Sequence, residues 1–506
     1  MAEKEKESEK RLAFDYYTRN DAFVKERFLA KDYDRATACG LGNFDRLFAF
    51  FCQMDLFSLF DFRPKARQRI MIPTALLLST YSAKIICEMN SLNQVDMQLF
   101  KDRALLEMIG FTGVQIEEGF SKRNKGRHLP FNISTLGKLM PDFSPAETNA
   151  LFSNQFALLA QKNFIPSGIF AADSTPLYVS FHSKYPNTGI IKKDGKRYRG
   201  YKLITLKYVG SFSPKARPKP EIFVGAILVP LNESENKYLL PLLEQARKNI
   251  GPDKIKMVVV DRGFLSGENL WEVKHKYGTD FLIYSKSNMD VTKELNVRLK
   301  DARDRQKRGL PEDEDKNLFF QKDNQHTVYG FNALRWFWTY GDKEHQVEMK
   351  KKIYRKEEHF KTNPISGAII TRYKDKEDKN ITLLSSRKFS EGFTPLDAIS
   401  FYRKRQQIEN AGFRELKQGY NIGNFPSRKY NGVFFHVLFT LTIFNFVTAF
   451  KTETGGKTAT LGLRRLHRSI SFVGIILHAW PHFGLFHPNE IFGWISYAGK
   501  GLRAPP

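Results

Sequence analysis

The run Gly168-Ile-Phe-Ala-Ala-Asp173 ends an apolar stretch in a carboxylate, and Met257-Val-Val-Val-Asp261 repeats the pattern. Continuous apolar runs of this length are typical of strands buried on both faces of a sheet. A carboxylate just past such a strand points into the crevice at the strand's carboxyl end, where open α/β sheets bind ligands. Taken alone, either aspartate is better explained as a turn former or a helix cap. The order of the surrounding elements and a third carboxylate favour a shared site.

That third carboxylate is Glu409, within the helical segment Tyr402-Arg-Lys-Arg-Gln-Gln-Ile-Glu409. Two strand-end aspartates and a helical glutamate can hold a pair of hard divalent cations through oxygen ligands. In a basic protein, two cations facing phosphate suggest chemistry on nucleic-acid strands. We therefore interpret Asp173, Asp261 and Glu409 as a metal-binding acidic triad.

The chain is strongly basic. Its 506 residues include 80 Lys and Arg against 54 Asp and Glu, which gives a net charge of +26. This excess indicates a large polyanionic partner, although a basic surface that binds nothing is the alternative. The length is sufficient for two to four domains with substantial cores.

Cysteine usage and the amino terminus indicate the compartment. Only Cys39, Cys52 and Cys87 occur, and none forms a CxxC pair, which argues for a reducing environment and against structural zinc. The first ten residues are charged and lack an apolar signal core, so we expect a cytoplasmic protein. The apolar stretch Val433–Phe450 is long enough to span a membrane, but it contains polar residues and follows a charged helix. We expect it to be a buried core helix, with no membrane partner.

The amino-terminal 150 residues carry apolar positions at helical spacing, over residues 44–60, 72–86 and 97–109, and predict an all-helical domain. After this domain the spacing of the apolar residues changes from helical to strand-like. Strands are expected at Ile169–Asp173, Tyr201–Val209, Glu221–Val229, Lys256–Val260 and Asp280–Ser285, with helices at Tyr238–Asn249 and 266–277. Three consecutive strands and then helix, strand, helix, strand describe an α/β mixed sheet flanked by helices, and this order matches the ribonuclease-H-like fold.

The remaining boundaries follow from composition. Residues 165–286 form the first part of this core. Residues 287–394 break into charge-rich, short strand-like runs and predict a β-rich insertion. A long helix from Pro395 through Lys417 returns to the core, whose second part is 395–450, and residues 451–506 are expected to be a basic tail. The basic segment Ser121–His128 is a candidate DNA contact.

Three motifs in order carry a family resemblance. The helix Tyr402-x2-Arg405-x3-Glu409, followed by Lys417, resembles the DDE transposases of prokaryotic insertion sequences, in the branch with a Tyr, Arg, Glu, Lys signature. Ala172-Asp-Ser-Thr175 looks like the first acidic motif of that family, and Val260-Asp-Arg-Gly-Phe264 looks like the second. The resemblance covers roughly residues 165 to 450.

The resemblance implies a two-metal phosphoryl transferase acting on DNA ends. Asp173, Asp261 and Glu409 would be catalytic and would hold two Mg2+ ions, with Mn2+ as a substitute. Tyr402, Arg405 and Lys417 would contact DNA phosphate near the element's end. A helix-surface pair, with Arg405 bridging to Glu409 at i,i+4 spacing, is the structural alternative.

One departure from the family pattern predicts a local distortion. Seven residues separate Glu409 from Lys417, where the family has six. The step from Ile408 to Phe413 is five, where four would keep both against a core. A single extra residue absorbed as a π-type bulge between Glu409 and Phe413 would repair both registers, and Gly412 lowers its steric cost.

The sequence thus predicts a cut-and-paste transposase with a helical end-binding domain at residues 1–150. Its partners would be double-stranded DNA, as transposon ends and target, and a second copy of the chain in the synaptic complex. It would be cytoplasmic in a prokaryote and associated with the nucleoid when bound to DNA. A nuclease of the same fold that cuts without joining strands and a domesticated, non-catalytic DNA-binding protein are the alternatives.

Overall fold

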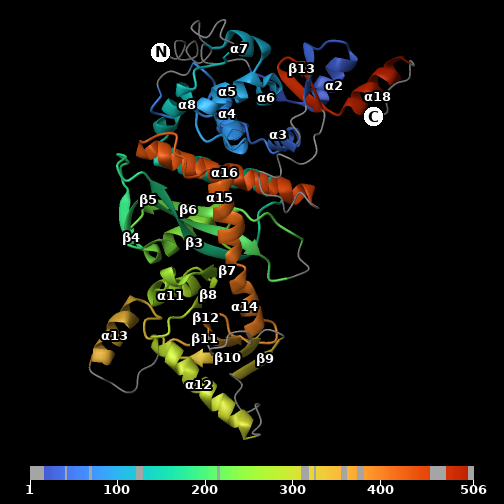
Figure 1. Ribbon diagram of the computed structural model, residues 1–506. Helices are drawn as coiled ribbons and strands as arrows, with labels where there is room; N and C mark the ends of the chain where they lie inside the picture. Colours follow the sequence, from blue (N-terminus) through green and yellow to red (C-terminus); the bar gives the residue numbers. More distant parts are fainter. Residues whose placement is uncertain are drawn as a thin grey trace, which may run out of the picture. The chain divides into compact units, whose positions relative to one another are not determined.

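The computed structural model describes residues 16–39, 43–67, 71–120, 129–213, 217–308, 318–323, 326–354, 362–372, 381–455 and 474–499 (Figure 1). The chain divides into two compact units. The sheet unit comprises residues 166–178 and 188–413, and the terminal unit comprises residues 1–165, 179–187 and 414–506. The candidate DNA-contact segment Ser121–His128 lies outside the described residues.

The sheet unit is built on a ten-stranded mixed sheet, with strand order β4-β5-β3-β7-β8-β12-β11-β10-β9 and β6 paired to β5. Its strands are β3 (Gly168–Val179), β4 (Gly189–Lys193), β5 (Lys196–Gly210), β6 (Phe223–Pro230), β7 (Ile255–Val260), β8 (Asp280–Tyr284), β9 (Leu318–Lys322), β10 (His326–Leu334), β11 (Ile365–Arg372) and β12 (Ile381–Ser385). Its helices are α10 (Leu239–Ile250), α11 (Gly267–His275), α12 (Asp290–Lys307), α13 (Lys343–Tyr354) and α14 (Pro395–Arg403).

The central strands are parallel and apolar, as their sequences predict. β3 pairs in parallel with β7, and β7 pairs in parallel with β8. Residues Ile169–Ala172 and Met257–Val260 are fully buried, which explains why their sequences are continuously apolar rather than alternating. The mixed α/β fold expected from the sequence is therefore present in this unit.

The residues expected to form a β-rich insertion contribute four strands that continue the central sheet. Of these, β12 pairs antiparallel with β8, so β12, β11, β10 and β9 extend the central sheet. The same segment also contains the long helix α12, which packs on β10 and β11. This helix was not predicted from the sequence, because α12 is highly charged and few of its side chains are buried.

The terminal unit is mostly helical. Its helices are α2 (Asp21–Leu29), α3 (Asn43–Gln53), α4 (Thr74–Ile86), α5 (Asn93–Met97), α6 (Arg103–Met108), α7 (Gly113–Glu118), α8 (Ser134–Leu139), α9 (Pro145–Gln161), α15 (Arg414–Gln418), α16 (Tyr430–Thr454) and α18 (Pro488–Gly499). α16 is long and apolar enough to cross a membrane, but 94% of its most apolar window is buried inside the protein. It packs against α9, α4 and α3, which confirms that this helix is buried. It lies in the terminal unit, however, and not in the sheet unit with the core to which residues 395–450 were assigned.

Two expectations for the chain ends are wrong. The amino-terminal region is not all-helical, because it contains β1 (Thr18–Arg19) and β2 (Arg35–Cys39). The carboxyl-terminal region is not simply a tail, because it contains β13 (Gly474–Ala479) and β14 (His482–Phe486). These strands form one four-stranded sheet in the order β1-β14-β13-β2.

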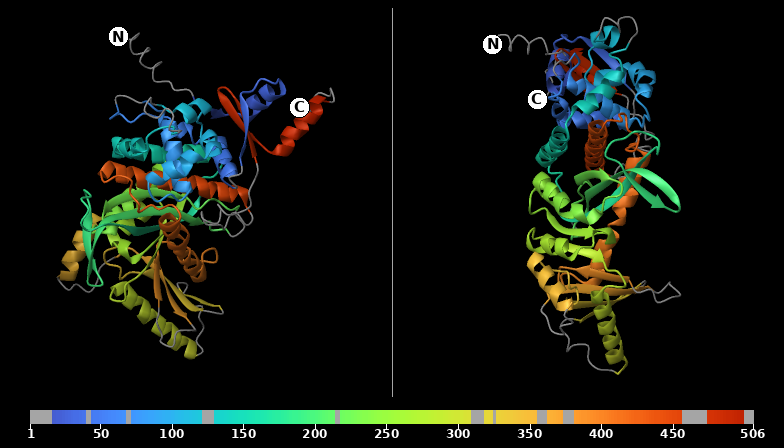
Figure 2. Two further views of the ribbon diagram at one scale, coloured as in Figure 1. Left: turned by 45° about the horizontal axis from the view of Figure 1, so that its top comes forward. Right: turned by 90° about the vertical axis from the view of Figure 1, so that its left-hand side faces the viewer.

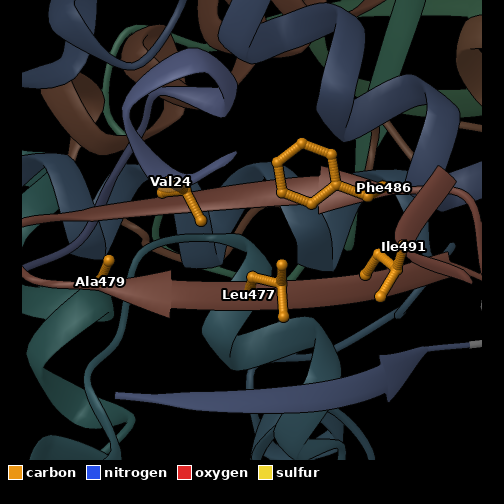
Figure 3. Packing of buried hydrophobic residues seen from close by; sticks show 5 residues of the cluster. All are labelled: Val24, Leu477, Ala479, Phe486 and Ile491. Carbon is orange, nitrogen blue, oxygen red and sulfur yellow. The ribbon is translucent and has the colours of Figure 1, made fainter. Parts of the chain in front are cut away.

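The two chain ends share a small core on this sheet (Figures 2 and 3). Val24 of α2 packs with Leu477, Ala479 and Phe486 of the antiparallel pair β13–β14 and with Ile491 of α18. Strands joined across more than 400 residues of sequence leave no local pattern, and β2, Arg35-Ala-Thr-Ala-Cys39, is too short and too little apolar to read as a strand.

Candidate active site

Asp173 and Asp261 are aligned by the pairing of β3 with β7. The last paired residues are Ala172 and Val260, so the two aspartates are the next residues on adjacent parallel strands. β7 ends there, as expected. β3 does not: it continues to Val179, so Asp173 lies within a strand rather than past its end. Asp173 is 7% exposed, whereas Asp261 is half-buried.

Helix α14 brings the signature residues to the same place. Its start is defined by a capping box between Thr394 and Asp397 and by Pro395 in the first turn. Near its end, Tyr402 is buried, and its hydroxyl donates a long hydrogen bond of 3.5 Å to the carbonyl oxygen of Val260. Its ring stacks on Tyr284 of β8, with centroids 3.8 Å apart. Tyr402 therefore fixes α14 against the ends of β7 and β8.

Arg405 joins two of the three predicted carboxylates. Its Nη1 lies 2.5 Å from Oδ2 of Asp173 and 3.6 Å from Oε1 of Glu409. The Arg405 side chain is 15% exposed and that of Glu409 is 57% exposed. The i,i+4 contact anticipated as the structural alternative is thus present, together with a shorter contact to Asp173. The Nε of Arg405 is buried and makes no hydrogen bond with a described residue.

The predicted π-type distortion is confirmed. After α14 the backbone tightens, with i→i+3 hydrogen bonds of 3.0 Å from Gln407 to Lys404 and from Ile408 to Arg405. It then widens into a π-helix, η7, over Ile408–Phe413. Both end residues of this π-helix are buried, as the five-residue step between them requires.

Gly412 has a packing reason as well as a backbone one. A Cβ at this position would lie 3.0 Å from Cζ of Phe223 on β6, which is closer than most real contacts. Only glycine lets the π-helix approach the sheet this closely without a shift of the Phe223 ring.

Burial and like charge act together on Asp173. Burial raises its pKa to about 6, against the lowering effects of Arg405 and of a 2.8 Å hydrogen bond from the Ser174 backbone N–H. The carboxylates of Glu409 and Asp261 raise the pKa further. Burial disfavours the charge on Arg405, but Asp173 and the other nearby anionic groups raise its pKa overall. Three carboxylates therefore influence one another around a single guanidinium.

No formed metal cage accompanies this cluster: among the described residues, no three His, Cys, Asp or Glu side chains lie close enough to hold an ion. The donor chemistry nevertheless fits a hard divalent cation. Asp173, Asp261 and Glu409 offer only carboxylate oxygens, and the repulsion between them is what a cation would relieve.

Lys417 is placed differently from the other predicted residues. It is exposed on α15, in the terminal unit, beside the buried Leu416. Its contact with phosphate stays a prediction.

Sequence reasoning missed a further carboxylate, Glu235, in the short helix η4 (Glu235–Tyr238). Its Oε1 accepts a 2.6 Å hydrogen bond from Ser174 Oγ and lies 3.4 Å from Nζ of Lys202. A Cβ added at Gly263 would lie 2.4 Å from its Oε2. Glu235 thus bridges the segment after Asp173 and the segment after Asp261. No motif marks it, because its partners lie on other elements.

Comparison with known families identifies the region that contains this cluster. The family model described as "Transposase DDE domain" matches residues 166–446. No curated protein sequence matches the chain. Among solved structures, the piggyBac transposase synaptic complex with hairpin DNA is similar at 13% identity and a TM-score of 0.39, with 92% of this chain and 82% of that chain covered. Because the family model spans more than half of the 506 residues, the chain belongs to the transposase DDE domain family.

Proposed function

We propose that this protein is a cut-and-paste transposase that cleaves DNA at the ends of an insertion sequence and joins the freed ends to a target. Asp173, Asp261 and Glu409 are its catalytic carboxylates. The observation that carries the proposal is the convergence of Asp173 and Glu409 on Arg405, with Asp261 aligned beside Asp173 on the adjacent strand.

The strand order supports a ribonuclease-H-like core. The order β6-β5-β3-β7-β8, with β6 antiparallel to β5 and with β7 and β8 parallel to β3, follows the sequence of elements predicted for that fold. The two aspartates then come from its first and fourth strands, and Glu409 from the helix that follows the extension of the sheet.

The carboxylates would bind two divalent cations, Mg2+ or Mn2+, which when bound activate water or a DNA 3′-hydroxyl and stabilise the leaving oxygen. Asp173 is positioned for this by the Ser174 N–H and is ionised above a pKa of about 6. The protein itself forms no covalent bond to DNA.

Arg405 would bind a DNA phosphate, and Tyr402 would support that contact. Arg405 keeps one buried donor, Nε, outside its contacts with Asp173 and Glu409, and a guanidinium can bind two phosphate oxygens at once. Tyr402 holds the helix that carries Arg405 against β7 and β8. Lys417 is proposed as a third phosphate contact, with double-stranded DNA as the partner and a dimer as the synaptic assembly.

The test uses the full chain and DNA that carries the inverted repeats flanking its reading frame. Asp173→Asn, Asp261→Asn and Glu409→Gln should each abolish Mg2+-dependent cleavage and leave DNA binding within a few-fold of wild type, because affinity rests on many Lys and Arg contacts. Asp253→Asn, at an exposed loop aspartate of the same unit, is the matched control and should cleave normally.

The outcomes separate the alternatives. Cleavage by one of the three variants at close to the wild-type rate would exclude that residue from the catalytic set. A wild-type protein that cleaves these ends but never joins them to a target would be a nuclease. A wild-type protein that binds the ends and does not cleave them with Mg2+ or Mn2+ would be a non-catalytic binding protein.

A further inference from the structure

Strands β4 and β5 form a basic hairpin, and the repulsion between its like charges destabilises it in the free protein. β4 (Gly189–Lys193) and the first residues of β5 pair antiparallel, and Asp194-Gly195 form the turn with φ of 52° and 74°. Positive φ at both turn residues is the type I′ geometry that suits a tight hairpin. β6 pairs with Tyr201–Lys207, so this end of β5 extends beyond β6 (Figure 2).

Four cations stand in two successive cross-strand pairs. Lys192 lies opposite Arg197, and Lys193 lies opposite Lys196. Like charges directly opposite each other destabilise an antiparallel pair. Since neighbouring residues of a strand point to opposite faces, the two pairs give each face of the hairpin tip its own double positive charge.

Nothing described in the protein neutralises these charges. All four side chains are exposed, and none makes an ion pair with a described residue. Asp194, in the turn itself, is the only acidic residue between positions 188 and 200. By contrast, Arg199 at the base of the hairpin donates a 2.6 Å hydrogen bond to Thr188 Oγ1. The repulsion is therefore confined to the tip, which indicates that the compensating negative charge comes from a partner.

We propose that this hairpin tip enters a groove of double-stranded DNA and contacts the phosphate backbone on both sides. The inference rests on the proposed function, which makes DNA the substrate. The major groove is about 12 Å wide and admits a two-stranded ribbon. A tip with one pair of cations on each face meets phosphates on both walls, whereas an acidic protein surface would match only one face. Lys and Arg contacts to phosphate position a protein without reading sequence, so this contact is sequence-independent.

The measurement is the salt dependence of binding of the full-length protein to a 40-base-pair duplex of arbitrary sequence. Each phosphate contact contributes about 0.9 to the slope of log K against log salt. The quadruple variant Lys192→Ala, Lys193→Ala, Lys196→Ala, Arg197→Ala should therefore lower the magnitude of this slope by about 3 to 4.

The control removes the same number of charges elsewhere in the sheet unit. Lys300→Ala, Lys307→Ala, Lys350→Ala and Lys351→Ala are exposed positions on α12 and α13 with no ion pair to a described residue. This variant should change the slope by less than about 1. A further variant, Lys192→Arg, Lys193→Arg, Lys196→Arg, keeps the charges and should retain the wild-type slope.

A single substitution separates binding from folding. Lys196→Glu places an acid opposite Lys193, so it should raise the thermal midpoint of the free protein while weakening DNA binding at least tenfold. If Lys196→Glu loses DNA binding and also has a lower thermal midpoint, the hairpin is damaged and this variant does not test the contact. The arginine variant then tests it, because it keeps the charges and should retain the wild-type slope.

Each outcome bears on one proposal. A wild-type protein without affinity for duplex DNA would overturn the proposed function. Normal wild-type binding, with the alanine variant keeping its slope within about 1 of wild type, would overturn the role of the hairpin. If the quadruple alanine variant binds duplex DNA normally and loses affinity only for single-stranded DNA or for an acidic peptide, double-stranded DNA is not the partner of the hairpin.

Discussion

Arg405 Nη1 lies 2.5 Å from Oδ2 of Asp173, across 232 residues of sequence. The same nitrogen lies 3.6 Å from Glu409, one turn further along the chain. A residue expected from its family position to contact DNA phosphate thus also holds two carboxylates of the predicted triad. Its guanidinium is the positive charge that lets Asp173 ionise in a buried position.

The first prediction follows from this charge. The pKa of Asp173 is raised to about 6 by burial, and Arg405 opposes the rise, so Arg405→Ala should raise that pKa further. Asp173 is protonated below its pKa, and metal binding requires the ionised form. The midpoint of Mn2+ binding, measured by calorimetry between pH 5 and 9, should therefore move to higher pH by about 1 to 3 pH units.

Arg405→Lys is the matched control, because it keeps the charge and should shift the Mn2+-binding midpoint less. An unchanged midpoint in Arg405→Ala would mean that Arg405 does not control the ionisation of Asp173.

The second prediction concerns Glu235 and Gly263. Alanine at Gly263 would place its Cβ 2.4 Å from Oε2 of Glu235, so it should displace the carboxylate that accepts from Ser174. Gly263→Ala should cost about 1–3 kcal/mol of unfolding free energy and weaken Mn2+ binding. The double variant Glu235→Ala, Gly263→Ala should be no worse than Glu235→Ala alone, because the clashing carboxylate is gone.

Glu235→Gln is the conservative control and should keep most of the Mn2+ affinity, since its amide oxygen can still accept from Ser174 Oγ. Strictly additive losses in the double-mutant cycle would show that the two residues act independently.

What the sequence could predict depends on how local each signal is. The placement of Asp173 beside Asp261 follows from two apolar runs, because the residues that end these runs are neighbours on paired parallel strands, although β3 itself continues past Asp173. The π-helix was predictable from the five-residue step between Ile408 and Phe413. Glu235 was not, because its contacts with Ser174 and Lys202 join separate elements.

The contacts between the two ends of the chain are even harder to predict, because they join residues that lie further apart in sequence. Buried Glu107 of α6 pairs with Arg35 of β2 at 3.0 Å and with His478 of β13 at 3.3 Å. Nearby hydrogen-bond donors and His478 hold the pKa of Glu107 at about 2 despite burial, which by itself raises it. An ion network spanning more than 370 positions has no periodicity, so composition suggested a tail where the chain in fact returns to its beginning.

The third prediction concerns a buried cation in the terminal unit. Lys84 of α4 is 1% exposed, has Nζ 5.8 Å from the ring centroid of Tyr81, and has its pKa lowered by burial to about 8. Between pH 8 and about 10.4 the unfolded chain binds the proton more tightly than the folded one, so stability rises with pH in that window. Below pH 8 the full penalty of roughly 3 kcal/mol applies.

Lys84→Met keeps the apolar stem and removes the charge, so it should raise the thermal midpoint at pH 7 and lose that advantage by pH 10.5. Lys101→Met, at an exposed position, is the control and should show no such pH dependence. An advantage of Lys84→Met that is equal at both pH values would show that the gain comes from packing alone.

The fourth prediction tests the π-helix as an absorbed insertion. Deleting Ala411, an exposed residue within η7, should convert the wide turn to a regular α-helical one and return Ile408 and Phe413 to i,i+4 spacing. An added alanine after Ala411 should instead rotate the following residues by about 100° and turn Phe413 and Leu416 away from their buried positions. Burial of such side chains stabilises by about 1.5–3 kcal/mol each, so the insertion should lower the thermal midpoint by many degrees. The deletion should lower it only slightly, because both residues stay buried and only the fit of Gly412 against Phe223 changes. Equal losses from deletion and insertion, measured by calorimetry on the full-length protein, would show that the π-helix is required by packing rather than tolerated as an extra residue.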